Sequence, residues 1–219
     1  MRKPKDFYRH LCNLDFVPTT VFDVGVAWGT PELYEAFPNA YYYLFEALPS
    51  FEPSLKSIMK QLHGEYHLIA LASRSGSERI YVGREPIQRA GASVFHREPK
   101  PSADVEEIQL RRLDDIMGGK ELPGPVLMKI DAQGSDIEVL KGGEETVKQC
   151  DLVIVETGLH PFRNEDNQTY RVISYMASQG FATYDFLSPL ARPYDKALGQ
   201  IDVVFVKEDS PLRKYPLWA

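Results

Sequence analysis

One stretch near the N-terminus constrains the fold of this chain more than any other. Residues 21–29 read Val-Phe-Asp-Val-Gly-Val-Ala-Trp-Gly, a short apolar, β-prone run that contains an acid and then gives way to two glycines. Thr30, Pro31 and Glu32 follow, and they are typical of a helix N-cap, a first-turn proline and a first-turn acid. The sequence therefore predicts a strand, a glycine turn and a helix, in that order.

The glycine spacing indicates which nucleotide such a turn would hold. Turns of this kind bind nucleotide cofactors because glycine allows close backbone approach and the helix N-terminus offers unpaired N–H donors. A dinucleotide site needs G-x-G-x-x-G, whereas Asp23, Gly25 and Gly29 form D-x-G-x-x-x-G. Asp23 would repel phosphate and suits a cationic or hydroxyl-bearing ligand such as S-adenosylmethionine. The alternative is an ordinary turn in which Asp23 caps local backbone.

Length and composition restrict the class of protein. The chain has 219 residues, 43% apolar and 26% charged, which predicts one globular domain over residues 1–219. A formal net charge of −6 argues against a nucleic-acid partner. No pattern of a secretory leader or membrane span is visible, so we expect no membrane association and a cytoplasmic location. Cys12 and Cys150 lack metal-type spacing.

Glu46 is the second informative residue, because it ends the aromatic run Tyr-Tyr-Tyr-Leu-Phe. It follows Gly25 by 21 positions. In a βαβ unit, an acid about 20 residues after the glycine turn binds the ribose hydroxyls, although a surface acid at a strand end is the alternative. The next apolar run, residues 67–71, is expected to end beside these strands, which assigns Leu71 and Ala72 to an adenine slot by position.

Another apolar run ends in Asp131, with Gln133 two positions later. Both are expected at the carboxyl end of a strand, where open α/β sheets bind ligands. Lys129 and Asp131 share one face of that strand, so they form either a structural ion pair or a pair of catalytic groups. Ser135 and Glu138 have the spacing of a capping box that opens the following helix.

The rest of the chain supplies further candidates. Glu156 ends another apolar run, and His160 lies in the loop after it. The connection over residues 84–103 is long for a compact domain and is interpreted as a substrate-binding loop. An N-terminal helical segment is expected within residues 1–18, with its helix over 4–13. Further helices are expected over residues 31–37, 113–117 and 170–179. Strands are expected over residues 78–83, 106–110, 152–156, 181–186 and 201–206, and a loop over 187–200 joins the last two.

With these residues in hand, the chain resembles the FkbM family of S-adenosylmethionine-dependent O-methyltransferases over about residues 13–187. The segments that carry the resemblance are FVPTTVFDVGVAWG, YLFEALP, ALASRSG, LRRLDDIM and MKIDAQGSDIEVLKG. The chain departs from the family pattern at Ala27, where Asn or His is usual, at Ala47, where Pro is usual, and at Gln133 and Asp136, where two glutamates are usual. The resemblance implies a Rossmann-like class I methyltransferase fold, with a seven-stranded, mostly parallel sheet, an antiparallel last strand and, in this chain, an added β element.

The resemblance implies S-adenosylmethionine as cofactor and, as acceptor, a small-molecule or glycan hydroxyl on a sugar or natural product. We predict Asp131 as the base, with Lys129 and His160 as second choices, and an Mg²⁺ held by Asp131 and neighbouring acids is a further hypothesis. The other predicted site residues are Asp23, Gly25, Gly29, Glu46, Leu71 and Ala72 for the cofactor, and Arg89, Ser93, His96, Gln133 and Glu156 for the substrate. Two alternatives stay open: a catalytically silent cofactor-binding module, suggested by Gln133, and a dinucleotide-dependent oxidoreductase.

Overall fold

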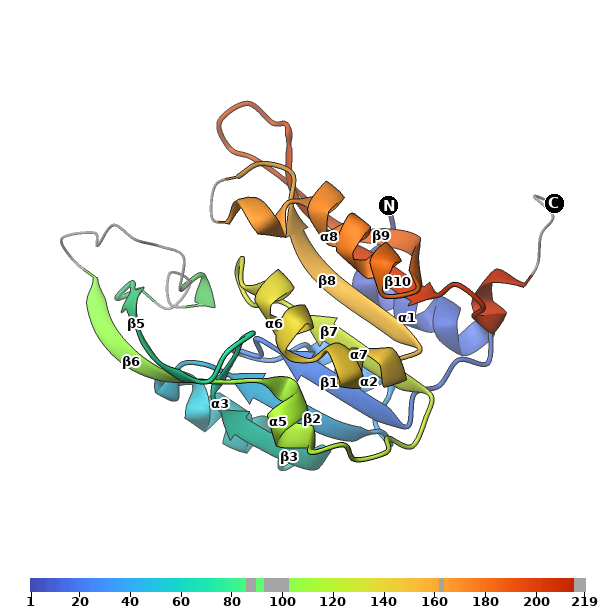
Figure 1. Cartoon of the computed structure of the whole chain (residues 1–219), viewed down its shortest axis with the longest axis horizontal. Coiled ribbons are helices and arrows are strands. Elements are labelled where there is room, and N and C mark those ends of the chain that lie inside the picture. The colour runs from blue at the N-terminus through green and yellow to red at the C-terminus, as the bar shows by residue number, and fades with distance from the viewer. Residues whose placement is uncertain (86–89, 93–102, 162–163, 215–219) are drawn as a thin grey trace.

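The main layer of the protein is a seven-stranded sheet in the order β3-β2-β1-β7-β8-β10-β9 (Figure 1). The computed structural model describes residues 1–85, 90–92, 103–161 and 164–214. The strands of this sheet are β1 (Thr20–Val24), β2 (Tyr41–Glu46), β3 (His63–Leu68), β7 (Val126–Ile130), β8 (Leu152–Gly158), β9 (Phe181–Ala191) and β10 (Leu198–Lys207).

The strand directions bring the predicted acids to one edge of the sheet. Strands β3, β2, β1, β7 and β8 are parallel, and the last strand of the chain, β10, runs antiparallel to β8 and β9. The predicted mostly parallel sheet with an antiparallel last strand is therefore confirmed. The winding direction reverses between β1 and β7, and open α/β sheets bind ligands at the carboxyl ends of the strands at such a point.

Helices cover both faces of the main sheet (Figure 1). One face packs against side chains such as Leu113, Leu140 and Met176, and the other against Phe7 and Leu33. The helices of the first face are α5 (Leu113–Met117), α6 (Asp136–Gly142), α7 (Glu144–Gln149) and α8 (Thr169–Ser178), those of the second are α1 (Pro4–Asn13), α2 (Pro31–Ala36) and α3 (Glu52–Ile58), and short 3-10 turns span Pro49–Phe51, Glu165–Asn167 and Pro211–Arg213.

A small second sheet stands beside the carboxyl-terminal edge of the main sheet and confirms the added β element. It consists of β4 (Ala70–Leu71), β5 (Gly76–Val82) and β6 (Asp104–Arg111), in the order β4-β6-β5. The long ribbon of β5 and β6 projects from one end of the molecule in Figure 1. Its apolar side chains, including Ile80 and Ile108, form a separate core with Leu48 and Phe51.

Two sequence expectations about elements are wrong. The apolar run over residues 67–71 is not one strand, because β3 ends at Leu68 and Ala70 to Leu71 pair with β6 instead. The loop expected over residues 187–200 is mostly strand, since β9 and β10 continue into a long hairpin. Pro189 is tolerated in β9 because this strand lies at the edge of the sheet, where a missing N–H breaks no second ladder.

Candidate active site

A cavity of about 820 Å³ lies at the carboxyl ends of β1, β2 and β7 and is also lined by the second sheet. Ligand sites in proteins span about 300–1,000 Å³, so the cavity is large enough for a cofactor. Its walls include residues 24–30 after β1, 45–48 at the end of β2, 69–74 around β4, 78–81 of β5, Ile108 and Leu110 of β6, and Lys129, Asp131, Ala132, Gln133, Ser135 and Glu138 around the β7 turn.

Gly25 opens the turn after β1, and its neighbour across the sheet explains why glycine stands there. Its φ is +83°, and a Cβ atom at this position would lie 1.9 Å from the carbonyl oxygen of Asp131. Only glycine allows the turns after β1 and β7 to approach this closely. The glycine is thus required by a contact between two turns, and the ligand contact expected of it stays a prediction.

Glu46 ties the β1 turn to the end of β2. Its carboxylate accepts hydrogen bonds from the backbone N–H of Ala27 and of Leu48, both at 2.8 Å. Burial raises the pKa of Glu46, and these N–H groups partly offset that rise. Ala27 has a φ of +46°, a left-handed conformation that the Asn or His of the family pattern adopts more readily than alanine. Each carboxylate oxygen can accept a further hydrogen bond, so Glu46 retains capacity for ribose hydroxyls on the cavity side.

Asp23 does not line the cavity. It is fully buried one residue before the end of β1, where Tyr34 donates a hydrogen bond to its Oδ2 at 2.6 Å. The ammonium of Lys129 lies 3.8 Å from its Oδ1 and 3.4 Å from Oδ2 of Asp131. Lys129 therefore joins the buried Asp23 to the cavity-lining Asp131. The geometry supports an action of Asp23 on the site through Lys129 rather than through direct contact with a ligand.

Of the three candidate bases, Asp131 and Lys129 line the large cavity, and their electrostatics distinguish them. Burial opposes the charge of Lys129, but Asp131 and Asp23 outweigh it and raise the pKa of the ammonium well above its usual range. A lysine held in its protonated form is a hydrogen-bond donor and cannot take a proton. Burial likewise opposes the charge of Asp131, but Lys129 and the hydrogen bonds to this carboxylate lower its pKa, so Asp131 is ionised and can accept one.

Gln133 stands where the family pattern has a glutamate, and its hydrogen bonds show the effect of that replacement. Its amide Nε2 donates to Oδ1 of Asp131 at 2.7 Å and to Oε2 of Glu156 at 3.3 Å. A glutamate here would bring a third carboxylate to two others, whereas the amide donates to both. Glu156 thus contacts both Gln133 and Asp131, and its hydrogen bond with Asp131 helps to lower the pKa of that carboxylate, although Glu156 does not line the large cavity.

Asp136 fixes the turn that carries Asp131. Its buried carboxylate accepts hydrogen bonds from the backbone N–H of Ala132 at 2.7 Å, from that of Gly134 at 3.0 Å and from Nδ2 of Asn167 at 2.9 Å. Burial raises the pKa of Asp136 to about 6. Asn167 also accepts from the N–H of Ile137 at 3.2 Å, so the start of α6 is held from both sides.

The remaining predicted residues fall into three groups. Gly29, Leu71 and Ala72 line the large cavity. His160 does not, because it lies with Glu156 beside a separate small cavity of about 20 Å³. The predicted substrate residues Arg89, Ser93 and His96 lie outside the described residues.

Sequence comparison identifies the chain. Residues 23–183, most of its length, match the Methyltransferase FkbM domain. The chain belongs to the FkbM methyltransferase family. The resemblance drawn from its motifs is thereby confirmed. A search of curated proteins found no sequence relative.

Solved structures place this FkbM methyltransferase in a known fold. It is similar to magnesium protoporphyrin IX methyltransferase from Synechocystis PCC 6803 with bound SAM, at 10% identity and a TM-score of 0.51, covering 93% of this chain and 77% of that one. It is also similar to the N-methyltransferase NodS from Bradyrhizobium japonicum WM9, at 6% identity and a TM-score of 0.50, covering 93% of both chains. The Rossmann-like class I methyltransferase fold is thus confirmed.

Sequence reasoning missed three side chains of this FkbM methyltransferase site. Trp28 is 51% exposed, lines the cavity and packs edge-on against Phe51, with ring centroids 5.3 Å apart. An indole between two glycines of a turn is a signal that would have indicated this role. Ser73 and Tyr34 carried no comparable signal, because their partners are 65 and 11 positions away in the sequence.

Two findings concern metals and membranes. The described part of the chain contains no group of three or more His, Cys, Asp or Glu side chains placed to hold a metal ion, and the hypothesis of an Mg²⁺ at Asp131 is not supported. None of the helices in the described ranges is long and apolar enough to cross a membrane.

Proposed function

We propose that this FkbM methyltransferase transfers the methyl group of S-adenosylmethionine to a hydroxyl of a sugar or of a natural-product small molecule. The observation that carries the proposal is the cavity at the sheet edge, which combines the β1 glycine turn, the Glu46 carboxylate and the Asp131 carboxylate in one wall. These groups suit, in that order, the methionine end, the ribose hydroxyls and a reacting hydroxyl.

The cofactor would be held by residues from several elements. The turn with Gly25 and Gly29 would receive the methionine end, Glu46 the ribose hydroxyls, and Leu71 with Ala72 the adenine. When bound, the cofactor supplies a methyl group on a positively charged sulfur, which is already activated for displacement. The protein's own task is therefore to align the acceptor and to receive its proton.

Asp131 is the residue best suited to receive that proton. A carboxylate with a lowered pKa is too weak to deprotonate a free alcohol, but the hydroxyl becomes strongly acidic as its oxygen forms the new bond. Transfer to Asp131 late in the step is then downhill. Lys129 would orient Asp131 and balance its charge, which makes Lys129 a positioning residue.

A turnover assay tests the function. The purified chain is incubated with methyl-labelled S-adenosylmethionine and a panel of glycans and macrolide alcohols, and label transfer and S-adenosylhomocysteine release are measured. We expect transfer to at least one hydroxyl class. Binding of the cofactor without transfer across the panel would favour the silent module, and binding of NAD in place of S-adenosylmethionine would favour the oxidoreductase.

The variant Asp131→Asn tests the assignment of the base. We expect transfer to fall by about 10²-fold or more, because the amide cannot receive the proton. The affinity for S-adenosylhomocysteine, measured by calorimetry, should stay within about threefold of the native value, a difference of less than about 1 kcal/mol. Asp6→Asn, on the exposed face of α1, serves as the control. Transfer that survives in Asp131→Asn at a comparable rate would show that the base lies elsewhere.

A further inference from the structure

Glu138 has a role that its sequence position does not indicate. Its spacing from Ser135 predicts a capping box, but the Ser135 side chain makes no cap hydrogen bond at the start of α6, so the predicted capping box is wrong. The Glu138 carboxylate instead lines the large cavity and accepts hydrogen bonds from the Ser73 hydroxyl and, at 2.9 Å, from Lys141. Its side chain is 26% exposed.

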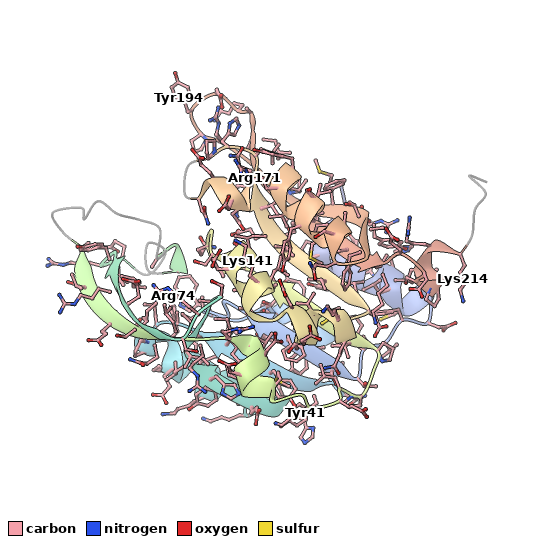
Figure 2. The ribbon with its side chains drawn as sticks, in the orientation of Figure 1. Tyr41, Arg74, Lys141, Arg171, Tyr194 and Lys214 are labelled. Carbon is pink, nitrogen blue, oxygen red and sulfur yellow. The ribbon has the colours of Figure 1, made fainter. Side chains whose placement is uncertain are left out.

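The wall around Glu138 is built rigidly. Helix α6 packs on the turn after β4, and a Cβ atom on Gly142 would lie 2.0 Å from the carbonyl oxygen of Ala72. The absence of a side chain at Gly142 therefore seats the helix directly on that turn. Figure 2 labels Arg74, which follows β4, and Lys141 on α6. Glu138 is thereby held at the end of β4.

The chemistry of this wall suits a flat heterocycle that carries an N–H donor on its edge. Leu71 and Ala72 provide an apolar surface, and Glu138 stands beside it as an acceptor. Burial opposes ionisation of Glu138, but the hydrogen bonds from Ser73 and Lys141 outweigh it and lower its pKa. The carboxylate is therefore charged at neutral pH, and its oxygens keep room for further hydrogen bonds.

The neighbouring charged groups are less suitable acceptors. Arg74 can only donate, and its guanidinium is bound to Glu78 at 2.7 Å. Glu78 also lines the cavity, but its side chain is 42% exposed and is held by that guanidinium. Glu138, at 26% exposure, is more buried than Glu78.

We propose that Glu138 recognises the amino group of adenine and so selects an adenine nucleoside over its 6-oxo counterpart. The inference rests on the proposed cofactor, because it places the base next to the ribose at Glu46, against Leu71 and Ala72. A 6-oxo purine would turn a carbonyl oxygen toward the Glu138 carboxylate. That exchange loses one hydrogen bond and adds repulsion between two acceptors.

Calorimetry with two product analogues tests this role. The full-length chain is titrated with S-adenosylhomocysteine and with S-inosylhomocysteine, in which a keto oxygen replaces the amine. We expect the native protein to bind the adenosyl compound at least about tenfold more tightly. In Glu138→Ala the preference should shrink to less than about threefold, and in Glu138→Gln the inosyl compound should gain affinity because an amide can donate to its keto group.

Controls separate recognition from a structural role. Glu145→Ala removes an exposed carboxylate of α7 that bonds only to Lys148 among the side-chain contacts described for it, and it should leave the preference unchanged. A merely structural role of Glu138 would weaken both compounds equally and leave their ratio intact. If Glu138→Ala does not fold, the change in ratio in Glu138→Gln decides the question.

Three results would overturn the inference. They are a native protein that binds both compounds equally, an unchanged ratio in folded Glu138 variants, and a loss of preference in Glu78→Ala but not in Glu138→Ala. Failure of the native protein to bind S-adenosylhomocysteine at all would instead refute the proposed function itself, so the two failures are distinguishable.

Discussion

The turns after β1 and β7 look alike in sequence and differ in what they do. Each follows a buried parallel strand, and each combines an acid with a glycine at positive φ. Each also places a residue other than glycine at positive φ, Ala27 in one turn and Gln133 in the other. Yet Asp23 is hidden below the cavity, whereas Asp131 lines it.

Depth along the strand explains the difference. Asp23 lies level with Lys129 in the parallel register of β1 and β7. Asp131 comes two residues further along the same face, roughly 6.6 Å toward the cavity. The same residue type therefore places a carboxylate beneath the cavity at the end of β1 and a carboxylate in the cavity lining after β7. Lys129 lies between these two acids and links the two roles.

Substitution of Lys129 is the strongest test of this link. In Lys129→Met the buried Asp23 and the partly exposed Asp131 lose their shared cation, and loss of one partner from a buried ion pair such as that of Asp23 costs about 3–5 kcal/mol. We expect urea denaturation to show a loss of that size. Lys148→Met, which removes an exposed partner of Glu145, should cost less than about 1 kcal/mol. Equal losses in the two variants would mean that Lys129 does not hold the two turns together.

The contact between the turns can be tested separately from the backbone strain at Gly25. Gly25 and Gly180 have nearly equal φ values of +83° and +82°, but only Gly25 would place a Cβ atom against a neighbour, because nothing lies within 4 Å at Gly180. Alanine at Gly180 should cost about 1–2 kcal/mol for the left-handed conformation. Alanine at Gly25 should cost about 1–3 kcal/mol more for the overlap with Asp131. Chemical denaturation measures both, and matching losses would remove the close approach as the reason for Gly25.

The sequence was sufficient to predict the edge of the sheet at which the site lies. Apolar runs that end in acids fix the carboxyl ends of β1, β2, β7 and β8, and parallel pairing then gathers those ends. The depth of each acid was not predictable in the same way. One residue more or less between the acid and the strand end decides whether the side chain is buried or faces the cavity, and the register of Asp23 with Lys129 is a tertiary property.

Contacts between side chains that are distant in the sequence were not predictable either, because they too depend on tertiary structure. The capping-box spacing of Glu138 is a local signal, and the contact with Ser73 overrides it across 65 positions. The end of β9 and the start of β10, within residues 187–200, are predicted as a loop because the prolines there indicate one, whereas an edge strand accepts proline. Local sequence patterns thus predict where the helices and strands lie, whereas tertiary packing determines which distant side chains contact one another.

The pH dependence of stability tests the role of Asp136 in the turn after β7. Burial raises the pKa of Asp136 from 3.8 to about 6. The folded protein then binds this proton more tightly than the unfolded chain, so the free energy of unfolding should fall as the pH rises from about 4 to 6, by at most about 1.4 kcal/mol per pH unit. Asp136→Asn cannot titrate and should lose this slope.

Denaturation curves across that pH range measure the effect as a difference between native protein and variant, which cancels the titration of all other groups. Asp6→Asn is the control and should keep the native slope, because its exposed carboxylate contacts only the neighbouring Arg9 among the interactions described for it. Parallel curves for native protein and Asp136→Asn would show that Asp136 stays ionised throughout. In that case its hydrogen bonds from Ala132, Gly134 and Asn167 outweigh its burial, and the β7 turn is held by a full negative charge.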